Sequence, residues 1–208
     1  MTSSSVLRDL MAPFQRRSFA STLLGQDNLC CFPLTFTLES SFVQNMNGSV
    51  FMTGKSATYQ DYDNQRIRIE SEYTAYGQTF KDMALRFKLG STSYNYHVKD
   101  NTCTCYVGEF IIDKKCVPNT PIVQKANILN LKAFKIEERK SNGYSMNEWL
   151  VQGDHMSGDE CLPFRSYMVA NNLSIVETEG TNVKASVDAN VFKVPQHCPT
   201  LDKCSTRN

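Results

Sequence analysis

The sequence predicts an all-β protein, and three observations support this prediction. Apolar residues alternate with polar ones over short stretches, as they do in strands that bury one face. Asn-Gly pairs, which strongly favour tight hairpin turns, occur at Asn47-Gly48 and Asn142-Gly143. Outside the N-terminal arm, only Gln124–Leu131 hints at a helical i, i+3, i+4 pattern. An antiparallel sheet protein built from hairpins follows from these patterns.

The elements can be placed in order along the chain. The period of two is clearest where Ile67 and Ile69 alternate with charged residues. The predicted strands are Thr35–Leu38 continuing through Phe42-Val43, Ser49–Tyr59, Arg66–Glu70, Met83–Leu89, Ser93–Val98, Thr102–Val107, Ala126–Glu138, Tyr144–Gln152, Cys161–Val169, Leu173–Thr178 and Val183–Val191. Residues 1–29 form an N-terminal arm or targeting segment, residues 30–198 form the β domain, and residues 199–208 form a C-terminal tail.

Length and composition exclude several classes of protein. The chain has 208 residues, with 22 Lys and Arg against 21 Asp and Glu, so no strong field attracts nucleic acid. Its 41% apolar and 21% charged content excludes a disordered chain and a coiled coil. No run of apolar residues reaches the roughly 18 that a transmembrane helix needs. A soluble globular domain with one sizeable core remains.

Eight cysteines are the most informative feature of the composition. Zinc sites need two close cysteine pairs or nearby histidines, and the spacing here does not supply them. Disulfides are therefore favoured over zinc, and eight reduced thiols remain as the intracellular alternative. The first 25 residues contain three arginines and five serines but no long apolar run, which is typical of an organelle transit segment or a flexible arm. The cysteines indicate an extracellular or lumenal protein, whereas the N-terminus favours an intracellular or organellar one.

The sequence contains no catalytic motif, so we expect no enzyme activity. Asp61-Tyr62-Asp63 resembles a calcium loop at first sight, but it lacks the required glycine and glutamate and is interpreted as a solvated turn. Two sequons predict glycosylation at Asn47 and Asn172. Asn47 has a second explanation, because a tight hairpin turn itself favours Asn-Gly.

Five short motifs, in this order, resemble the ependymin-related family. They are Tyr62-Asp63-x-Gln65-Arg66-Ile67-Arg68, Asp100-Asn101-Thr102-Cys103, Cys116-Val117-Pro118, Glu160-Cys161-Leu162-Pro163 preceded by Trp149, and Val191-Phe192-Lys193-Val194-Pro195-Gln196-His197-Cys198. The resemblance covers about Cys30 to Cys198.

The resemblance implies a secreted, disulfide-bonded glycoprotein with two curved antiparallel sheets. They would form a half-barrel around an apolar pocket, similar to the folds of bacterial lipoprotein carriers. Lipid-like ligands, calcium and a homodimer are expected on the same ground. The resemblance also implies that Cys161 pairs with Cys30 or Cys31, and Cys103 with Cys198. A cysteine that some relatives carry between about Tyr76 and Asp82 is missing, which would leave Cys204 without its expected partner.

The loop-entropy model estimates how much such bridges stabilise the folded state. A Cys31–Cys161 bridge would stabilise the fold by about 5 kcal/mol and Cys103–Cys198 by about 4.7 kcal/mol. A Cys105–Cys116 bridge would contribute only about 2.8 kcal/mol. The long bridges would therefore decide whether the domain folds.

Two functions are compatible with these features. The first is a binding protein that holds a hydrophobic or lipid-like molecule in its concave face. The expected pocket residues are the apolar members of the alternating strands, namely Ile67, Ile69, Met83, Leu85, Phe87, Tyr94, Tyr96, Trp149 and Val151. The second is a structural or interaction protein embedded in a larger assembly through its arm and β domain.

Overall fold

The computed structural model describes residues 28–110, 112, 116–118, 122–128, 131–139, 145–152, 159–170 and 174–206. Over these residues the secondary structure is almost entirely β strand, which confirms the all-β prediction. The strands are β1 (Asn28–Cys31), β2 (Thr35–Met46), β3 (Ser49–Asp61), β4 (Arg66–Ala75), β5 (Gln78–Leu89), β6 (Thr92–Lys99), β7 (Thr102–Val107), β8 (Cys116–Pro118), β9 (Ile122–Ile128), β10 (Leu131–Arg139), β11 (Ser145–Gln152), β12 (Leu162–Ala170), β13 (Ser174–Lys184) and β14 (Ser205–Thr206). Two short 3-10 helices, η1 (Ala189–Phe192) and η2 (Leu201–Lys203), lie near the C-terminus.

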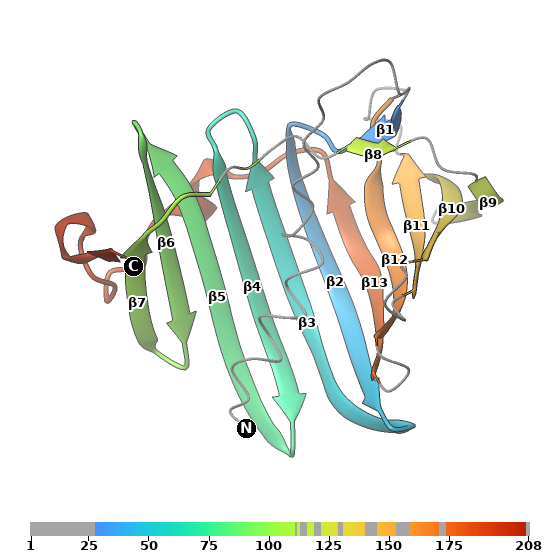
Figure 1. Cartoon of the computed structure of the whole chain (residues 1–208), viewed down its shortest axis with the longest axis horizontal. Coiled ribbons are helices and arrows are strands. Elements are labelled where there is room, and N and C mark those ends of the chain that lie inside the picture. The colour runs from blue at the N-terminus through green and yellow to red at the C-terminus, as the bar shows by residue number, and fades with distance from the viewer. Residues whose placement is uncertain are drawn as a thin grey trace.

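Twelve of these strands form one sheet in the order β14-β7-β6-β5-β4-β3-β2-β13-β12-β11-β10-β9. The neighbouring strands pair antiparallel, apart from the parallel contact of β14 with β7. Figure 1 shows the strands side by side from β7 on the left to β9 on the right. A separate ribbon of β1 and β8 lies at the upper right of that view.

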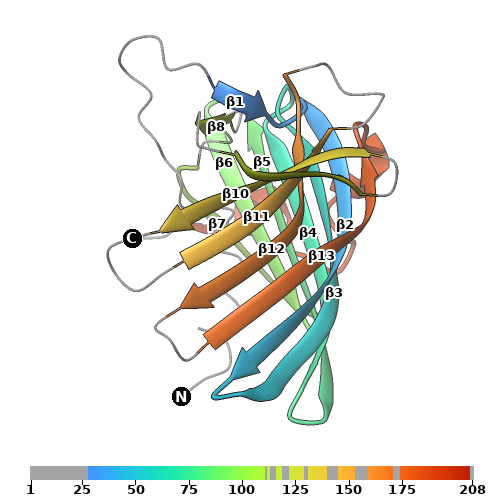
Figure 2. The same ribbon diagram turned by 90° about the vertical axis from the view of Figure 1, so that its right-hand side faces the viewer.

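The large sheet is strongly curved. Figure 2 shows β10 to β13 crossing in front of β4 to β6, so the sheet curls over on itself without closing into a barrel. The two curved sheets that were expected are thus two halves of one continuous sheet, joined by the antiparallel pairing of β13 with β2. We call the concave face, which carries Leu38, Ser40 and Phe42, the inner face, and the opposite face the outer face.

The main core lies at one end of the inner face. It joins both halves of the sheet with the β1–β8 ribbon through buried residues: Cys30, Phe32, Phe36, Leu38, Tyr62, Ile112, Val117, Phe134, Ile136, Leu150, Cys161 and Leu162. Disulfides Cys30–Cys161 and Cys31–Cys116 attach the ribbon to β12 and to itself. The ribbon therefore covers one end of the half-barrel.

A second core lies on the outer face, beneath residues 187–204. Met83, Leu85, Tyr96, Cys105 and Phe192 form its buried centre. Disulfides Cys103–Cys198 and Cys105–Cys204 fasten this C-terminal segment to β7. Residues 199–206, expected as a tail, thus lie on the sheet, with β14 paired to β7.

The hairpin predicted at Asn47-Gly48 is confirmed. Asn47 has φ 52° and Gly48 has φ 77°, as a turn with two left-handed central residues requires. The second predicted hairpin, at Asn142-Gly143, lies outside the described residues, although β10 and β11 on either side pair antiparallel.

Three predicted elements differ from the structure. Residues 126–138 are not one strand, because β9 and β10 form a hairpin there. The possible helix at Gln124–Leu131 is also wrong, because Gln124–Ile128 belong to β9 and Leu131 begins β10. The Val183–Val191 strand is also wrong beyond residue 184, where the chain leaves β13 to cross the outer face and forms η1. At that point Asp188 caps η1 by accepting a hydrogen bond of 2.9 Å from the Asn190 amide.

Candidate functional site

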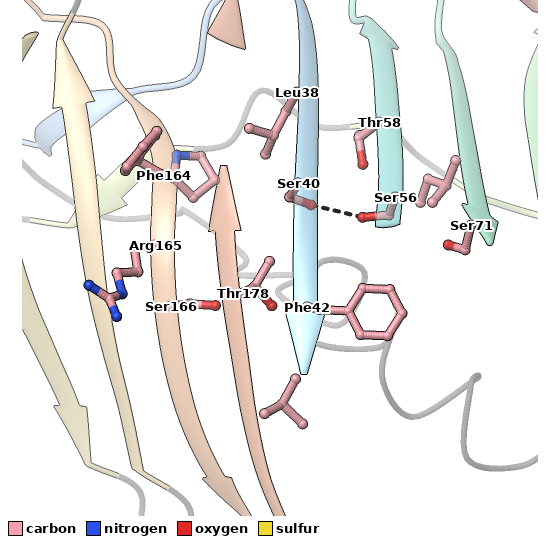
Figure 3. A pocket seen from close by; sticks show the side chains of 13 residues that line it. Leu38, Ser40, Phe42, Ser56, Thr58, Ser71, Phe164, Arg165, Ser166 and Thr178 are labelled. Carbon is pink, nitrogen blue, oxygen red and sulfur yellow. Dashed lines mark hydrogen bonds between the residues drawn. The ribbon is translucent and has the colours of Figure 1, made fainter. Parts of the chain in front are cut away.

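A pocket lies on the inner face, below the main core and between the two halves of the sheet. Its volume is about 100 Å³, far more than one water molecule needs. Strands β2, β3 and β4 supply one wall, and β12 and β13 supply the other (Figure 3). The lining residues are Leu38, Ser40, Phe42, Ser56, Thr58, Ile69, Ser71, Pro163, Phe164, Arg165, Ser166, Val176 and Thr178.

The pocket lining is amphipathic. Six of its side chains are apolar and six are hydroxyls, in addition to Arg165. Arg165 is exposed at the pocket edge, and its guanidinium points away from the serines (Figure 3). Such a surface can contact apolar groups and also exchange hydrogen bonds with polar ones. It therefore suits a molecule that has both.

A row of serines crosses the pocket floor. Ser40 lies opposite Ser56, and Ser56 lies opposite Ser71, so these three residues occupy one line perpendicular to the strands. The Ser40 and Ser56 hydroxyls are 2.8 Å apart and share a hydrogen bond (Figure 3). The same line continues to Asp82 on β5, opposite Ser71. We call Ser40, Ser56, Ser71 and Asp82 the serine row.

An aromatic row runs beside the serine row. Phe42 lies opposite Gly54, Gly54 opposite Tyr73, and Tyr73 opposite Phe80. The Phe42 ring occupies the space over Gly54, where a Cβ atom would come within 2.7 Å of the Phe42 Cζ. The Tyr73 and Phe80 rings stack with centroids 5.3 Å apart. This row forms an apolar border to the hydroxyls.

Asp82 is a buried carboxylate at the end of the serine row. Its side chain is 6% exposed, and its Oδ1 lies 2.6 Å from Nε2 of the partly exposed His97. This is ion-pair distance, but Oδ1 receives no aligned hydrogen bond from the residues that the structure describes. The pair is attractive when Nε2 of His97 carries a proton.

Tyr73 lies next to this carboxylate. Burial, together with the negative charges of Asp82 and Asp100, raises the pKa of Tyr73 to about 12. Its hydroxyl therefore keeps its proton at neutral pH and remains a hydrogen-bond donor. Within the described part of the chain, this buried hydroxyl has no hydrogen-bond partner.

The nine residues expected to line the pocket lie in different parts of the structure. Ile69 lines the pocket, and Ile67 packs against the main core. Five others lie on the outer face under the C-terminal segment, namely Met83, Leu85, Phe87, Tyr94 and Tyr96. Val151 and Trp149 belong to a further cluster with Ala133 and Phe164. Of these two, the fully buried residue is Val151.

The C-terminal segment covers the outer face, where polar contacts hold it in addition to the two disulfides. Arg68 Nη1 donates a hydrogen bond of 2.7 Å to the carbonyl oxygen of Val191. The Arg66 guanidinium carbon lies 4.4 Å from the centre of the Phe192 ring, a cation–π contact. Apolar residues of β5 and β6 are consequently core residues.

All eight cysteines are in disulfides. Cys161 pairs with Cys30, and Cys103 pairs with Cys198, in agreement with the pairings that the family resemblance implied. The expectation that Cys204 has no partner is wrong, because it pairs with Cys105. Cys116 pairs with Cys31, so the alternative Cys105–Cys116 bridge is also excluded. Four disulfides fit an oxidising extracellular or lumenal environment.

The turn that follows β3 is anchored by Asp61, whose side chain is 4% exposed. Its carboxylate accepts hydrogen bonds from the Asn64 amide, the Asn64 side chain and Arg66. Burial raises the pKa of Asp61, but the hydrogen bonds from Asn64 and Arg66 outweigh it and hold that pKa below its usual range. The turn is thus built around a buried ion pair, which corrects the interpretation as a solvated turn.

The other predicted sites differ in position. Asn47 is exposed at the tip of the β2–β3 hairpin, whereas Asn172 lies outside the described residues. Over the residues that the structure describes, no group of three or more His, Cys, Asp or Glu side chains could hold a metal ion. Nor does any helix among them have the length and apolar character needed to cross a membrane.

No protein-family model matches this chain, and no curated protein is significantly similar to it in sequence.

Proposed function

We propose that this protein is a non-enzymatic, secreted binding protein of the ependymin-like kind, and that it holds a lipid-like molecule in the inner-face pocket. One observation carries the proposal: the pocket lies between the two halves of a curved sheet and has a lining that is half apolar and half hydroxyl. Preformed concave sites with a few convergent polar groups are the usual geometry for small-molecule binding.

Three further features support this reading. The Cys30–Cys161 and Cys103–Cys198 bridges agree with the family resemblance. The set of disulfides suits a secreted protein. Asn47 stands exposed at a hairpin tip, where a glycan can be attached. Calcium binding and a homodimer stay predictions from the resemblance, and Asp61 would not serve calcium without giving up its contacts with Asn64 and Arg66.

A second candidate function, the structural or interaction protein, is favoured by the hairpin tips beyond the pocket. Val50 is 64% exposed and Tyr76 is 82% exposed on neighbouring hairpins. The Phe51 ring contacts Tyr76 edge to face at 4.9 Å. An exposed aromatic group of this kind is typical of a contact surface.

The binding function can be tested by filling the pocket. Thr178 is half-buried in the lining, so Thr178→Phe places a large ring in the space that a ligand would occupy. Glu177→Phe is the matched control, because Glu177 is the adjacent, exposed residue on the outer face of β13. We expect a medium-chain alkyl probe to bind the wild type and Glu177→Phe saturably, and Thr178→Phe at least tenfold more weakly. Equal affinity of all three proteins, or no binding to any, would reject the pocket as the binding site.

A further inference from the structure

The inner face contains three buried polar groups that receive no aligned hydrogen bond from the described residues, and one of them, Asp82 Oδ1, lies 2.6 Å from His97 Nε2. They are Gln44 Oε1, the Tyr73 hydroxyl and Asp82 Oδ1. Gln44 is 3% exposed, Tyr73 is 2% exposed and the Asp82 side chain is 6% exposed. Leaving such groups unpaired destabilises a folded protein, so their presence calls for a physical explanation.

None of the three residues lines the pocket itself, but each lies close to a lining residue in the sheet. Gln44 lies opposite Val176, a pocket residue, and its amide nitrogen is already used in a hydrogen bond of 3.0 Å to Ser174. Asp82 lies opposite the pocket residue Ser71. Tyr73 lies in the aromatic row beside them. Asp82 therefore belongs to the serine row, and Tyr73 and Gln44 both lie on the side of that row that faces the β2–β3 hairpin.

The kinds of group that are unpaired define the chemistry of the molecule that would satisfy them. Gln44 Oε1 and Asp82 Oδ1 can only accept hydrogen bonds at neutral pH, whereas the Tyr73 hydroxyl can donate one. The serine hydroxyls on the pocket floor donate and accept. A group that both donates and accepts at several positions matches this set.

Other head groups match less well. A carboxylate would be repelled by Asp82 and would leave both acceptors unpaired. An ammonium could satisfy the acceptors but not the Tyr73 donor, and His97 stands at 2.6 Å from Asp82 as a competing cation when protonated. Neighbouring hydroxyls of a polyol satisfy donors and acceptors together.

We infer that the pocket takes an amphiphile with an uncharged polyol head, such as a sugar or glycerol group, and that the serine row with Tyr73 and Gln44 binds this head. The apolar tail would lie against Leu38 and Ile69, across the serine row from Tyr73 and Gln44, and the stacked Tyr73 and Phe80 rings would cover one face of the head. This inference rests on the proposed binding function and specifies its ligand class.

The experiment compares probes that share a tail or a head, each below its micelle concentration, on the full oxidised chain by calorimetry. Octyl β-D-glucoside has both parts, methyl β-D-glucoside has only the head, and octanoate has the same tail with a carboxylate. We expect octyl glucoside to bind at least tenfold more tightly than either other probe. Comparable binding of methyl glucoside would indicate that a free sugar, rather than a glycolipid, is the source of the head, and would overturn the need for a tail.

Two variants test the role of the serine row. Ser71→Ala should weaken octyl glucoside about tenfold, the loss expected for one hydrogen bond. Asp82→Asn should also weaken octyl glucoside but strengthen octanoate, because the repelling charge is gone. A merely structural role of Asp82 would weaken both probes equally. Ser41→Ala, on the outer face of β2 between Ser40 and Phe42, is the control and should change neither affinity.

The outcomes separate this inference from the proposed function. If octanoate binds the wild type as tightly as octyl glucoside, or if Ser71→Ala leaves octyl glucoside unaffected, the polyol head is rejected while the binding function stands. If neither octyl probe binds, the binding function fails and the inference falls with it. Ser71→Ala keeps the test valid even if Asp82→Asn fails to fold.

Discussion

Cys105 and Cys204 are joined by a disulfide across 99 residues of sequence, and this bridge lies beside a second one that fastens the same segment, Cys103–Cys198. Because the two bridges close nearly the same long loop, either one alone already imposes most of the restriction that the pair places on the unfolded chain. When the first bridge is present, forming the second closes an effective loop of only roughly ten residues, and this short loop sets its stabilisation on the loop-entropy model.

This overlap predicts that the stabilising effects of the two bridges are not additive. Replacing Cys105 and Cys204 with serine should cost about 2.7 kcal/mol, rather than the about 4.7 kcal/mol of an isolated loop of this length. Removing both bridges should cost more than the sum of the two single removals. Urea unfolding of the three variants measures these differences, and strictly additive losses would contradict the overlapping arrangement.

The Asp61 carboxylate should contribute stability that depends on pH. Asp61→Asn keeps the shape but loses the charge opposite Arg66, so we expect a loss of about 1–3 kcal/mol at pH 7. The folded-state pKa of Asp61 is lowered, so its contribution is complete above the unfolded-state pKa of about 3.9 and is lost as the pH falls through the folded-state pKa. Unfolding midpoints from pH 7 to pH 2 should therefore converge for wild type and variant at the acid end.

Asp63→Asn serves as the control for that experiment, because Asp63 is exposed in the same turn. Its stability difference from the wild type should be small at every pH. A constant gap between wild type and Asp61→Asn down to pH 2 would contradict the ion-pair role.

Gly54 should be irreplaceable for a packing reason. A Cβ atom there would lie 2.6 Å from the Glu72 carbonyl oxygen and from the Tyr73 Cβ, and one of these is backbone. Gly54→Ala should therefore destabilise the protein by about 1–3 kcal/mol, although alanine ordinarily suits a strand interior better than glycine. An unchanged or raised unfolding midpoint would contradict the close approach of β4 to this position.

Gly48 should be sensitive for a different reason. No atom lies within 4 Å of the Cβ position, but the φ of 77° is unfavourable for other residues. Gly48→Val should cost about 1–2 kcal/mol, because a β-branched side chain tolerates this conformation poorly. Gly48→Asn should recover most of that loss, since asparagine adopts positive φ readily, and equal midpoints for the Val and Asn variants would argue against the turn.

The sequence was sufficient to predict those features that depend on local chemistry. Alternating residues located most strands, and Asn47-Gly48 placed its turn, because period two and positive φ are local requirements. The strand predicted up to Val191 was wrong because its alternation continues into a segment that crosses the outer face. Nothing in the alternation marks the point at which Asp188 begins the 3-10 helix.

The position of the pocket could not be predicted in the same way. Alternation identifies two faces of each strand but not the face that becomes concave, and register decides which residues share it. Ile69 lies opposite Ala84, so Leu85 belongs to the outer face. The outer face of β5 is buried by a segment more than a hundred residues later, and so apolar character did not distinguish pocket from core. The inward serines, such as Ser40 between Leu38 and Phe42, were the available signal.

The single tryptophan offers a direct reading of pocket occupancy. Trp149 packs in one cluster with Phe164, and Phe164 lines the pocket, so Trp149 lies one residue behind the pocket wall. An octyl probe that enters the pocket should displace water from the Phe164 ring and shift the Trp149 emission modestly and saturably. Lengthening the tail should tighten binding by about 0.8 kcal/mol for each methylene that is buried, until the pocket is full. Thr178→Phe should abolish the shift while Glu177→Phe retains it. Calorimetric binding without any change in emission would show that the ligand does not reach Phe164, and would move the binding site away from the β12 wall.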